Sequence, residues 1–192
     1  MKLSKILGAA AVAALALMAF ASTASATTIE TNGVTKAGAV TFDWSLSGST
    51  EWETTAGAFL NTCSSGTWAW TTAVWSGTTV SGSVSTLSSS NCTHEKVVVN
   101  SKGSLSIERI GTTTNGTVRS SGASVTVPVT VFGSVVSTTC TTSNTDLGTL
   151  NGTASGASSI TINAILTCSG LAPSAKWTGV VTGTGFSSGV VA

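Results

Sequence analysis

The chain has 192 residues, of which only 8% are charged, and its formal net charge is +1; charged residues make up about 25% of a typical soluble protein. So small a charge gives no basic patch for nucleic acid or for an anionic membrane surface, and neither is expected as a partner. Valine, isoleucine and threonine recur throughout, and six tryptophans need burial or a ligand. This composition favours a folded β protein over a disordered stalk.

The first 26 residues have the pattern of a secretory signal peptide. Two lysines precede an apolar stretch over residues 6–20, and the small residues Ala-Ser-Ala at 24–26 provide a cleavage site. The apolar stretch is too short to span a bilayer comfortably, and no second run of about 18 apolar residues follows. We therefore expect residues 1–26 to be a bacterial-type leader. Residues 27–192 are expected to form one exported domain without a transmembrane segment, secreted or held at the cell surface.

Alternating patterns predict many short strands after the leader. Residues 39–46 alternate with period two, which places Val40, Phe42, Trp44 and Leu46 on one face of a strand. No later segment has a convincing helical period. The pattern therefore predicts an all-β fold, a single antiparallel β-sandwich, with a barrel-like variant left open. The other expected strands cover residues 67–75, 78–87, 96–100, 104–110, 124–132, 134–140, 158–168 and 175–182.

Turn signals separate these segments. Asn-Gly pairs at 32–33, 115–116 and 151–152 suit the positive φ angles of tight turns. The last two pairs also match the N-glycosylation pattern, but in a bacterial-type chain we interpret them as turns. Residues 27–38 precede the first clear strand and could serve as a strand exchanged between copies.

The four cysteines all follow the leader and predict two disulfide bonds, because an even count in an exported chain indicates a disulfide framework. Of the three connectivities we favour Cys63–Cys92 and Cys140–Cys168, whose spacings of 29 and 28 residues are nearly equal. The alternative is a zinc site that includes His94, but that histidine stands at no recognised structural-zinc spacing from Cys92. A short similarity between residues 78–82 and 152–156 is compatible with two related halves.

No catalytic constellation is visible, so we expect no enzyme activity, no cofactor and no metal. His94 is the only histidine. Residues 185–189 match the nucleophile-elbow pattern, but that motif needs a helix, an acid and a histidine after it, and only three residues follow. Glu51 and Glu53, on either side of Trp52, form the only carboxylate pair that suggests glycoside hydrolysis. A solvated strand edge is the simpler interpretation of that pair.

The tryptophans are the most informative candidates for a binding site. Trp68 and Trp70 are two residues apart in an expected strand and therefore share a face, whereas Trp75 lies on the other face. An exposed pair of this kind could stack on sugar rings. The alternative is that the pair fills the core, because aromatic side chains bury large areas. Trp44 and Trp177 are expected in the core.

The segment from Cys168 to Trp177 (CSGLAPSAKW), within the four-cysteine, Ser/Thr-rich layout, resembles small secreted bacterial proteins of the alkane-oxidation-activator and biofilm-associated surface protein type. The resemblance implies a non-enzymatic extracellular protein connected with cell-surface hydrophobicity, adhesion or matrix. It supplies no catalytic residues that could be assigned to positions of this chain.

Two functions from different classes follow from these observations. The first is a non-enzymatic exported surface or matrix protein: an adhesin, a fibre subunit or a biofilm component. Its low charge and its Ser/Thr-rich strand edges would permit self-association into oligomers or fibres. The alternative is a secreted carbohydrate-binding module, in which a glycan or other cell-surface ligand stacks on Trp68 and Trp70.

Overall fold

The computed structural model describes residues 28–31, 34–36, 39–76, 78–153, 157–184 and 190–191, and every regular element in these ranges is a β-strand. The proposed leader, the Asn-Gly pair at 32–33 and the motif at 185–189 lie outside the described residues. The strands are β1 (Thr28–Thr31), β2 (Val34–Lys36), β3 (Thr41–Leu46), β4 (Thr50–Thr54), β5 (Phe59–Ser76), β6 (Thr79–Cys92), β7 (Val98–Arg109), β8 (Gly116–Val131), β9 (Ser134–Thr141), β10 (Thr145–Asn151), β11 (Ser159–Gly170), β12 (Ser174–Thr184) and β13 (Val190–Val191).

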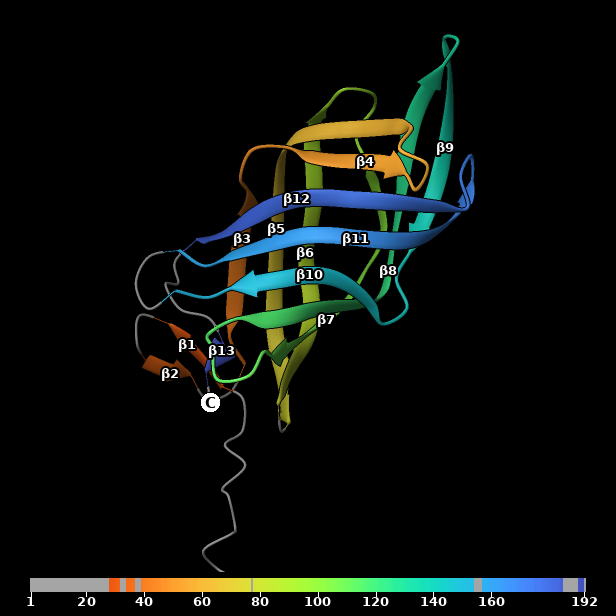
Figure 1. Ribbon diagram of the computed structural model, residues 1–192. Helices are drawn as coiled ribbons and strands as arrows, with labels where there is room; N and C mark the ends of the chain where they lie inside the picture. The colour runs from red at the N-terminus through yellow and green to blue at the C-terminus, as the bar shows by residue number, and fades with distance from the viewer. Residues whose placement is uncertain are drawn as a thin grey trace, which may run out of the picture.

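The strands β3 to β12 form one antiparallel sheet that closes on itself (Figure 1). β5, β6, β7 and β8 pair in chain order, and β11 pairs with β12. β3 and β4 both lie between β5 and β12, which completes the ring on that side. β9 and β10 both lie between β8 and β11. The expected all-β antiparallel fold is confirmed, in its barrel-like variant.

Each of these two strand pairs is a single strand with an interruption. The first breaks at residues 47–49, where Gly48 has a φ of +87°. The second breaks at residues 142–144, where Asn144 has a φ of +52°. Glycine and asparagine adopt positive φ at the lowest cost, so both breaks occur where the sequence permits a sharp bend. If β3 and β4 are counted as one strand, and β9 and β10 as another, the ring has two halves of four strands each. The first half comprises β3 to β7 and the second comprises β8 to β12.

The inside of the ring is the hydrophobic core. Phe42 and Trp44 are buried and their neighbours Thr41 and Asp43 are exposed, as the alternation over residues 39–46 predicts. In Figure 1, β5 and β6 run across the direction of β7, β10, β11 and β12, so the core is enclosed between two crossing layers. β1, β2 and β13 form a separate three-stranded sheet. The exchange of residues 27–38 between copies stays a prediction.

Some strands differ from their expected bounds. The segments expected at 96–100 and 104–110 are parts of one strand, β7, because Gly103 continues the chain with a φ of +66°. A Cβ atom at Gly103 would lie 2.4 Å from the backbone nitrogen of Ala123, so a side chain at this position would push β7 away from β8. β4 and β10 are not among the expected strands, because each is a short continuation beyond an interruption.

The predicted positive φ angles at Asn115 and Asn151 are wrong. In the described part of the chain, the non-glycine residues with positive φ are Asn91, Phe132 and Asn144. Asn115 has a different role, since its Oδ1 accepts a hydrogen bond of 3.0 Å from the backbone N–H of Gly152. This hydrogen bond joins the two Asn-Gly segments, and the φ angle of the asparagine in each segment is not positive.

Both predicted disulfides are confirmed, and the zinc alternative is excluded because no cysteine is free. Cys63 on β5 lies directly opposite Cys92 on β6, and Cys140 on β9 lies directly opposite Cys168 on β11. In each half of the ring the bond joins the second strand to the third. This equivalent placement agrees with two related halves, although residues 154–156 of the short sequence similarity lie outside the described residues.

Candidate functional site

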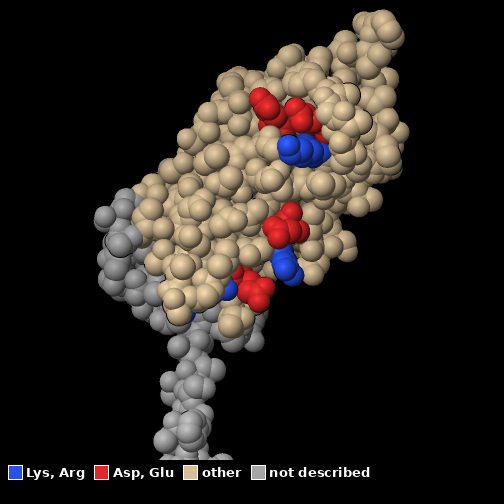
Figure 2. All heavy atoms as spheres, viewed as in Figure 1, with Lys and Arg blue, Asp and Glu red and all other residues tan. Residues whose placement is uncertain are grey.

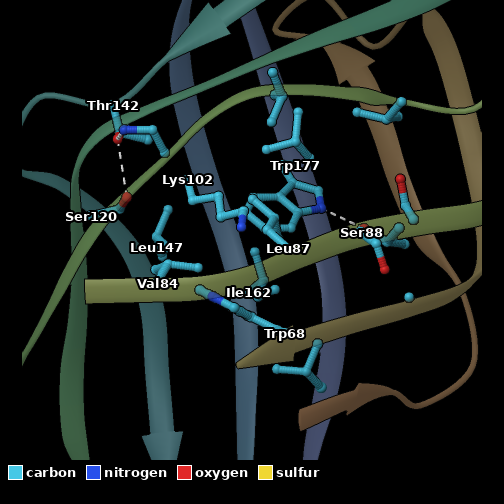
Figure 3. A pocket seen from close by; sticks show the side chains of 18 of the residues that line it. Trp68, Val84, Leu87, Ser88, Lys102, Ser120, Thr142, Leu147, Ile162 and Trp177 are labelled. Atoms are coloured by element: carbon cyan, nitrogen blue, oxygen red, sulfur yellow. Dashed lines mark hydrogen bonds between the residues drawn. The ribbon is translucent and has the colours of Figure 1, made fainter. Parts of the chain in front are cut away.

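An apolar cavity of about 70 Å³ lies inside the closed sheet. Figure 3 shows side chains from several strands converging on it, among them Trp68, Val84, Leu147, Ile162 and Trp177. Hydroxyl groups such as those of Ser120 and Thr142, which hydrogen-bond to each other at 3.0 Å, also reach the lining. A pocket with apolar walls and a few polar groups has the character of a small-molecule site.

Three tryptophans from three strands form one wall of this cavity. Trp52 on β4 and Trp177 on β12 are directly opposite in register, and their rings stack with centroids 5.1 Å apart and planes 8° from parallel. Trp68 on β5 lies against Trp177 with a centroid distance of 6.2 Å. Trp177 Nε1 donates a hydrogen bond to Thr50 Oγ1, which in turn donates to the carbonyl of Thr178. The position of Trp177 is therefore fixed at both its ring face and its nitrogen.

The indole nitrogens of Trp52, Trp68 and Trp70 are buried and have no hydrogen-bond acceptor among the described residues. Buried tryptophan N–H groups usually find a partner, since an unsatisfied buried donor costs about 1–3 kcal/mol. Trp52 and Trp68 belong to the cavity lining. In Figure 3 the nitrogen of Trp68 lies on the side of Val84 and Leu147, which are apolar wall residues. The Trp68 nitrogen is thus an unsatisfied donor buried within the apolar wall of the cavity.

The tryptophan pair proposed from the sequence is not an exposed platform. Trp68 is 4% exposed and Trp70 is 1% exposed, and Trp70 stacks on Phe42 with ring centroids 5.7 Å apart. Neither ring presents a face to solvent on which a sugar could stack, because the closure of the sheet places their strand face inside. The side chain of Trp75 lies outside the described residues, Trp44 is buried as expected, and Trp177 is half-buried at the cavity.

The other residues considered from the sequence lie around β4 and the start of β5. Glu51 is exposed and lies opposite Thr178, while the half-buried Glu53 lies opposite Lys176. The ring of His94 lies 5.9 Å from that of Phe59, the residue that pairs with Glu53 between β4 and β5. Within the described ranges, no three His, Cys, Asp or Glu side chains gather where they could hold a metal ion. Nor does this part of the chain contain a helix long and apolar enough to cross a membrane.

A second candidate site is the tip of the β8–β9 hairpin, which we call the apolar tip and define as Val131, Phe132 and Val135. All three side chains are exposed, and Phe132 is fully so at 104%. Figure 1 shows this hairpin extending beyond the rest of the sheet. The turn is formed by Phe132 and Gly133, whose φ angles are +49° and +79°. Positive φ at both central residues is typical of a tight turn that prefers Asn-Gly, so phenylalanine is an unfavourable choice for the backbone here.

The sequence pattern did not identify the apolar tip. Val125, Val127, Val129 and Val131 alternate, and the strand was expected to continue through residue 132. The first three are buried, but Val131 is exposed because the hairpin has by then left the ring. A signal was present in the Phe-Gly pair between two runs of valine, which is a possible two-residue turn.

The face seen in Figure 2 has few charges. Its charged side chains are confined to a few small groups, and the protruding hairpin is without charge in this view. The tip sequence from Val129 to Val136 contains no Asp, Glu, Lys or Arg. The apolar tip is therefore accessible without the removal of water from a charged group.

Comparisons with protein-family models, with curated proteins and with solved structures found no match to this chain.

Proposed function

We propose that the protein is a non-enzymatic exported surface protein that adheres to apolar surfaces through the apolar tip of its β8–β9 hairpin. The observation that carries this proposal is the full exposure of Phe132 at the end of a protruding, uncharged hairpin. Isolated apolar side chains on a protein surface are ordinary, but three adjacent ones on a convex projection indicate an interaction site.

The shape of the tip favours an extended surface over a small ligand. A convex projection cannot surround a small molecule, whereas it can insert into a deformable apolar layer or press against a solid one. Full burial of a phenylalanine side chain contributes about 1.5–3 kcal/mol, and the two valines add to this area. A few copies of such a protein acting together would attach firmly, because linked weak contacts multiply.

Export is supported by the two disulfide bonds, which persist in oxidising compartments, and by the leader pattern of residues 1–26. Adhesion also fits the resemblance to secreted proteins connected with cell-surface hydrophobicity. Self-association through the same tip is the related outcome, since two tips could cover each other.

The proposal is tested with Phe132→Asn, adsorbed to an alkyl-coated surface and to a hydroxyl-coated one. Asparagine tolerates the positive φ and completes an Asn-Gly turn, so the variant should fold with equal or higher thermal stability. We expect adsorption to the alkyl surface to weaken about tenfold, as the loss of one buried phenylalanine implies.

Ile165→Asn is the matched control, because Ile165 is 65% exposed on β11 and does not belong to the tip. It should adsorb like the unchanged protein. Light scattering before each measurement separates adhesion of single molecules from deposition of aggregates. If Phe132→Asn adsorbs as strongly as the unchanged protein, or if the control weakens equally, the tip is not the adhesive site.

A further inference from the structure

We propose that the cavity inside the ring binds the alkyl chain of an aliphatic carboxylate, which enters between β6 and β7 and leaves its head group at Lys102. This site is separate from the apolar tip and does not depend on the proposed adhesion.

We assign the way into the cavity to the part of the wall where the pairing between two strands ends. β6 and β7 pair from Thr79↔Glu108 to Ser83↔Ser104, and no pairing between them is found beyond this point. From there β6 stays paired with β5 as far as Cys92, and β7 stays paired with β8 back to Val98, each with a shift of register on the way. The unpaired parts of both strands line the cavity, through Val84, Leu87 and Ser88 on β6 and Val99 and Lys102 on β7. A wall without backbone hydrogen bonds is the weakest part of a closed sheet and is the natural entrance.

Lys102 lies across this entrance. Its Nζ donates a hydrogen bond of 2.6 Å to the carbonyl of Ser85, just beyond the last backbone pair between the two strands. Figure 3 shows its side chain extending over the cavity toward Leu87 and Trp177. An ammonium group has three donors, so the bond to Ser85 leaves two for a ligand. Lys102 is also exposed, which lets its head group move aside without breaking the fold.

The polar groups of the cavity lining favour a ligand that carries a hydrogen-bond acceptor, and the positive charge of Lys102 favours a ligand that is an anion. Lys102 is the only charged residue in the described lining, and no carboxylate accompanies it. A ligand with a cationic head would meet Lys102 with like charge, whereas a carboxylate would form a charge-assisted hydrogen bond with it.

The size of the cavity sets the shape of the apolar part. A cavity of about 150 Å³ lined by apolar side chains admits benzene. The volume here is about 70 Å³, which suits the end of an unbranched chain, with the remaining methylenes in the entrance against Leu87. Both a free fatty acid and an esterified acyl chain have such a tail, but only the free acid has the anionic head.

The test measures tryptophan fluorescence of the oxidised protein carrying Phe132→Asn, so that the apolar tip does not contribute, during titration with decanoate below its micelle-forming concentration. Decylamine, decanol and methyl decanoate are titrated in parallel. We expect saturable binding of decanoate, with decylamine, decanol and methyl decanoate each about tenfold weaker, since a charge-assisted hydrogen bond contributes at least that factor. Equal binding of decanoate and decylamine would overturn the assignment of an anionic ligand, and equal binding of methyl decanoate would overturn the choice of the free acid.

Two variants locate the ligand. Lys102→Gln removes the charge and keeps a donor near Ser85, so decanoate should bind about tenfold more weakly while decanol is unchanged. Ala123→Leu fills the lining opposite Lys102 and should weaken both ligands. Val99→Leu serves the same purpose from β7 if thermal unfolding shows that Ala123→Leu does not fold. Undiminished binding in Lys102→Gln, or in a folded variant with the filled cavity, overturns the proposal.

Discussion

The two halves of the ring contain the same covalent bond in the same place but in different surroundings. In the first half, Cys63–Cys92 closes a long hairpin in which β5 and β6 stay paired from Cys63↔Cys92 to Ser76↔Thr79, with two shifts of register. In the second half, Cys140–Cys168 joins β9 to β11, which are in register only from Thr141↔Thr167 to Thr138↔Gly170. The interruption at residues 142–144 separates this short ladder from the one that β10 makes with β11.

This difference separates two roles of a disulfide bond. With sequence separations of 29 and 28 residues, both bonds restrict the unfolded chain almost equally. In the folded protein, however, the first bond supports strands that a long ladder already holds together. The second bond supports two strands whose backbones pair over only a short stretch. We therefore expect similar effects on global stability and different effects on local opening.

The largest effect is expected from removal of either bond. Cys63→Ser/Cys92→Ser and Cys140→Ser/Cys168→Ser should each lower the free energy of unfolding by about 3–4 kcal/mol, because nearly equal loops lose nearly equal entropy. Denaturant unfolding measures these values. Amide hydrogen exchange should then differ, with much faster exchange over 138–141 and 167–170 in the second variant than over 63–67 and 88–92 in the first. Equal local exchange in the two variants would show that the length of the ladder does not matter.

A smaller effect is expected at Asn61, which lies two residues before Cys63 and is fully buried. Its Nδ2 donates hydrogen bonds to the carbonyls of Glu95 and Pro128, at 3.0 and 3.1 Å, and its Oδ1 accepts one of 3.2 Å from the backbone N–H of His94. Asn61→Leu should lower the free energy of unfolding by about 2–3 kcal/mol, because it leaves three backbone groups around a buried side chain without partners. Urea unfolding of the oxidised protein measures the loss, and a loss below that of an exposed Asn100→Leu control would contradict it.

The smallest effect is expected at Thr138, which holds the equivalent position two residues before Cys140. Its Oγ1 lies 3.1 Å from the carbonyls of both Ser169 and Ala172, in the segment that follows Cys168. Thr138→Val preserves the shape and removes only the hydroxyl, so we expect a loss of about 1 kcal/mol in the free energy of unfolding. The same urea series measures it. A larger loss of unfolding free energy at Thr138 than at Asn61 would contradict this order. It would show that the second half depends more than the first on the hydrogen bonds of its buried polar side chain.

The sequence was sufficient for the fold class and for the cysteine pairing. The alternation around Phe42 and Trp44 depends only on the period of a strand, and the disulfide framework depends only on cysteine number and spacing. Closure of the sheet could not be predicted, because residues 47–49 and 142–144 have the composition of turns. A turn normally reverses the chain, whereas here the strand resumes in the same direction beside the same neighbours.

The site residues show the same limit. Period two places Trp68 and Trp70 on one face but does not say whether that face is inside, and only ring closure decides it. Asn61 stands in an ordinary strand pattern. Nothing in the neighbouring sequence distinguishes a buried asparagine that holds three backbone groups from a solvated one. Lys102 becomes notable only because β6 and β7 separate beside it, which is a property of the pairing between distant strands.

The placement of the two disulfides also has a mechanical consequence. A protein held at a surface is pulled along its chain, and residues enclosed by a disulfide cannot extend even after the strands separate. The loops closed by Cys63–Cys92 and Cys140–Cys168, with separations of 29 and 28, each withhold about 100 Å of extended chain. Because one such loop lies in each half of the ring, tension would unravel the ends and the middle of the chain first. Both cysteine-closed loops would stay compact under load for as long as their surroundings remain oxidising.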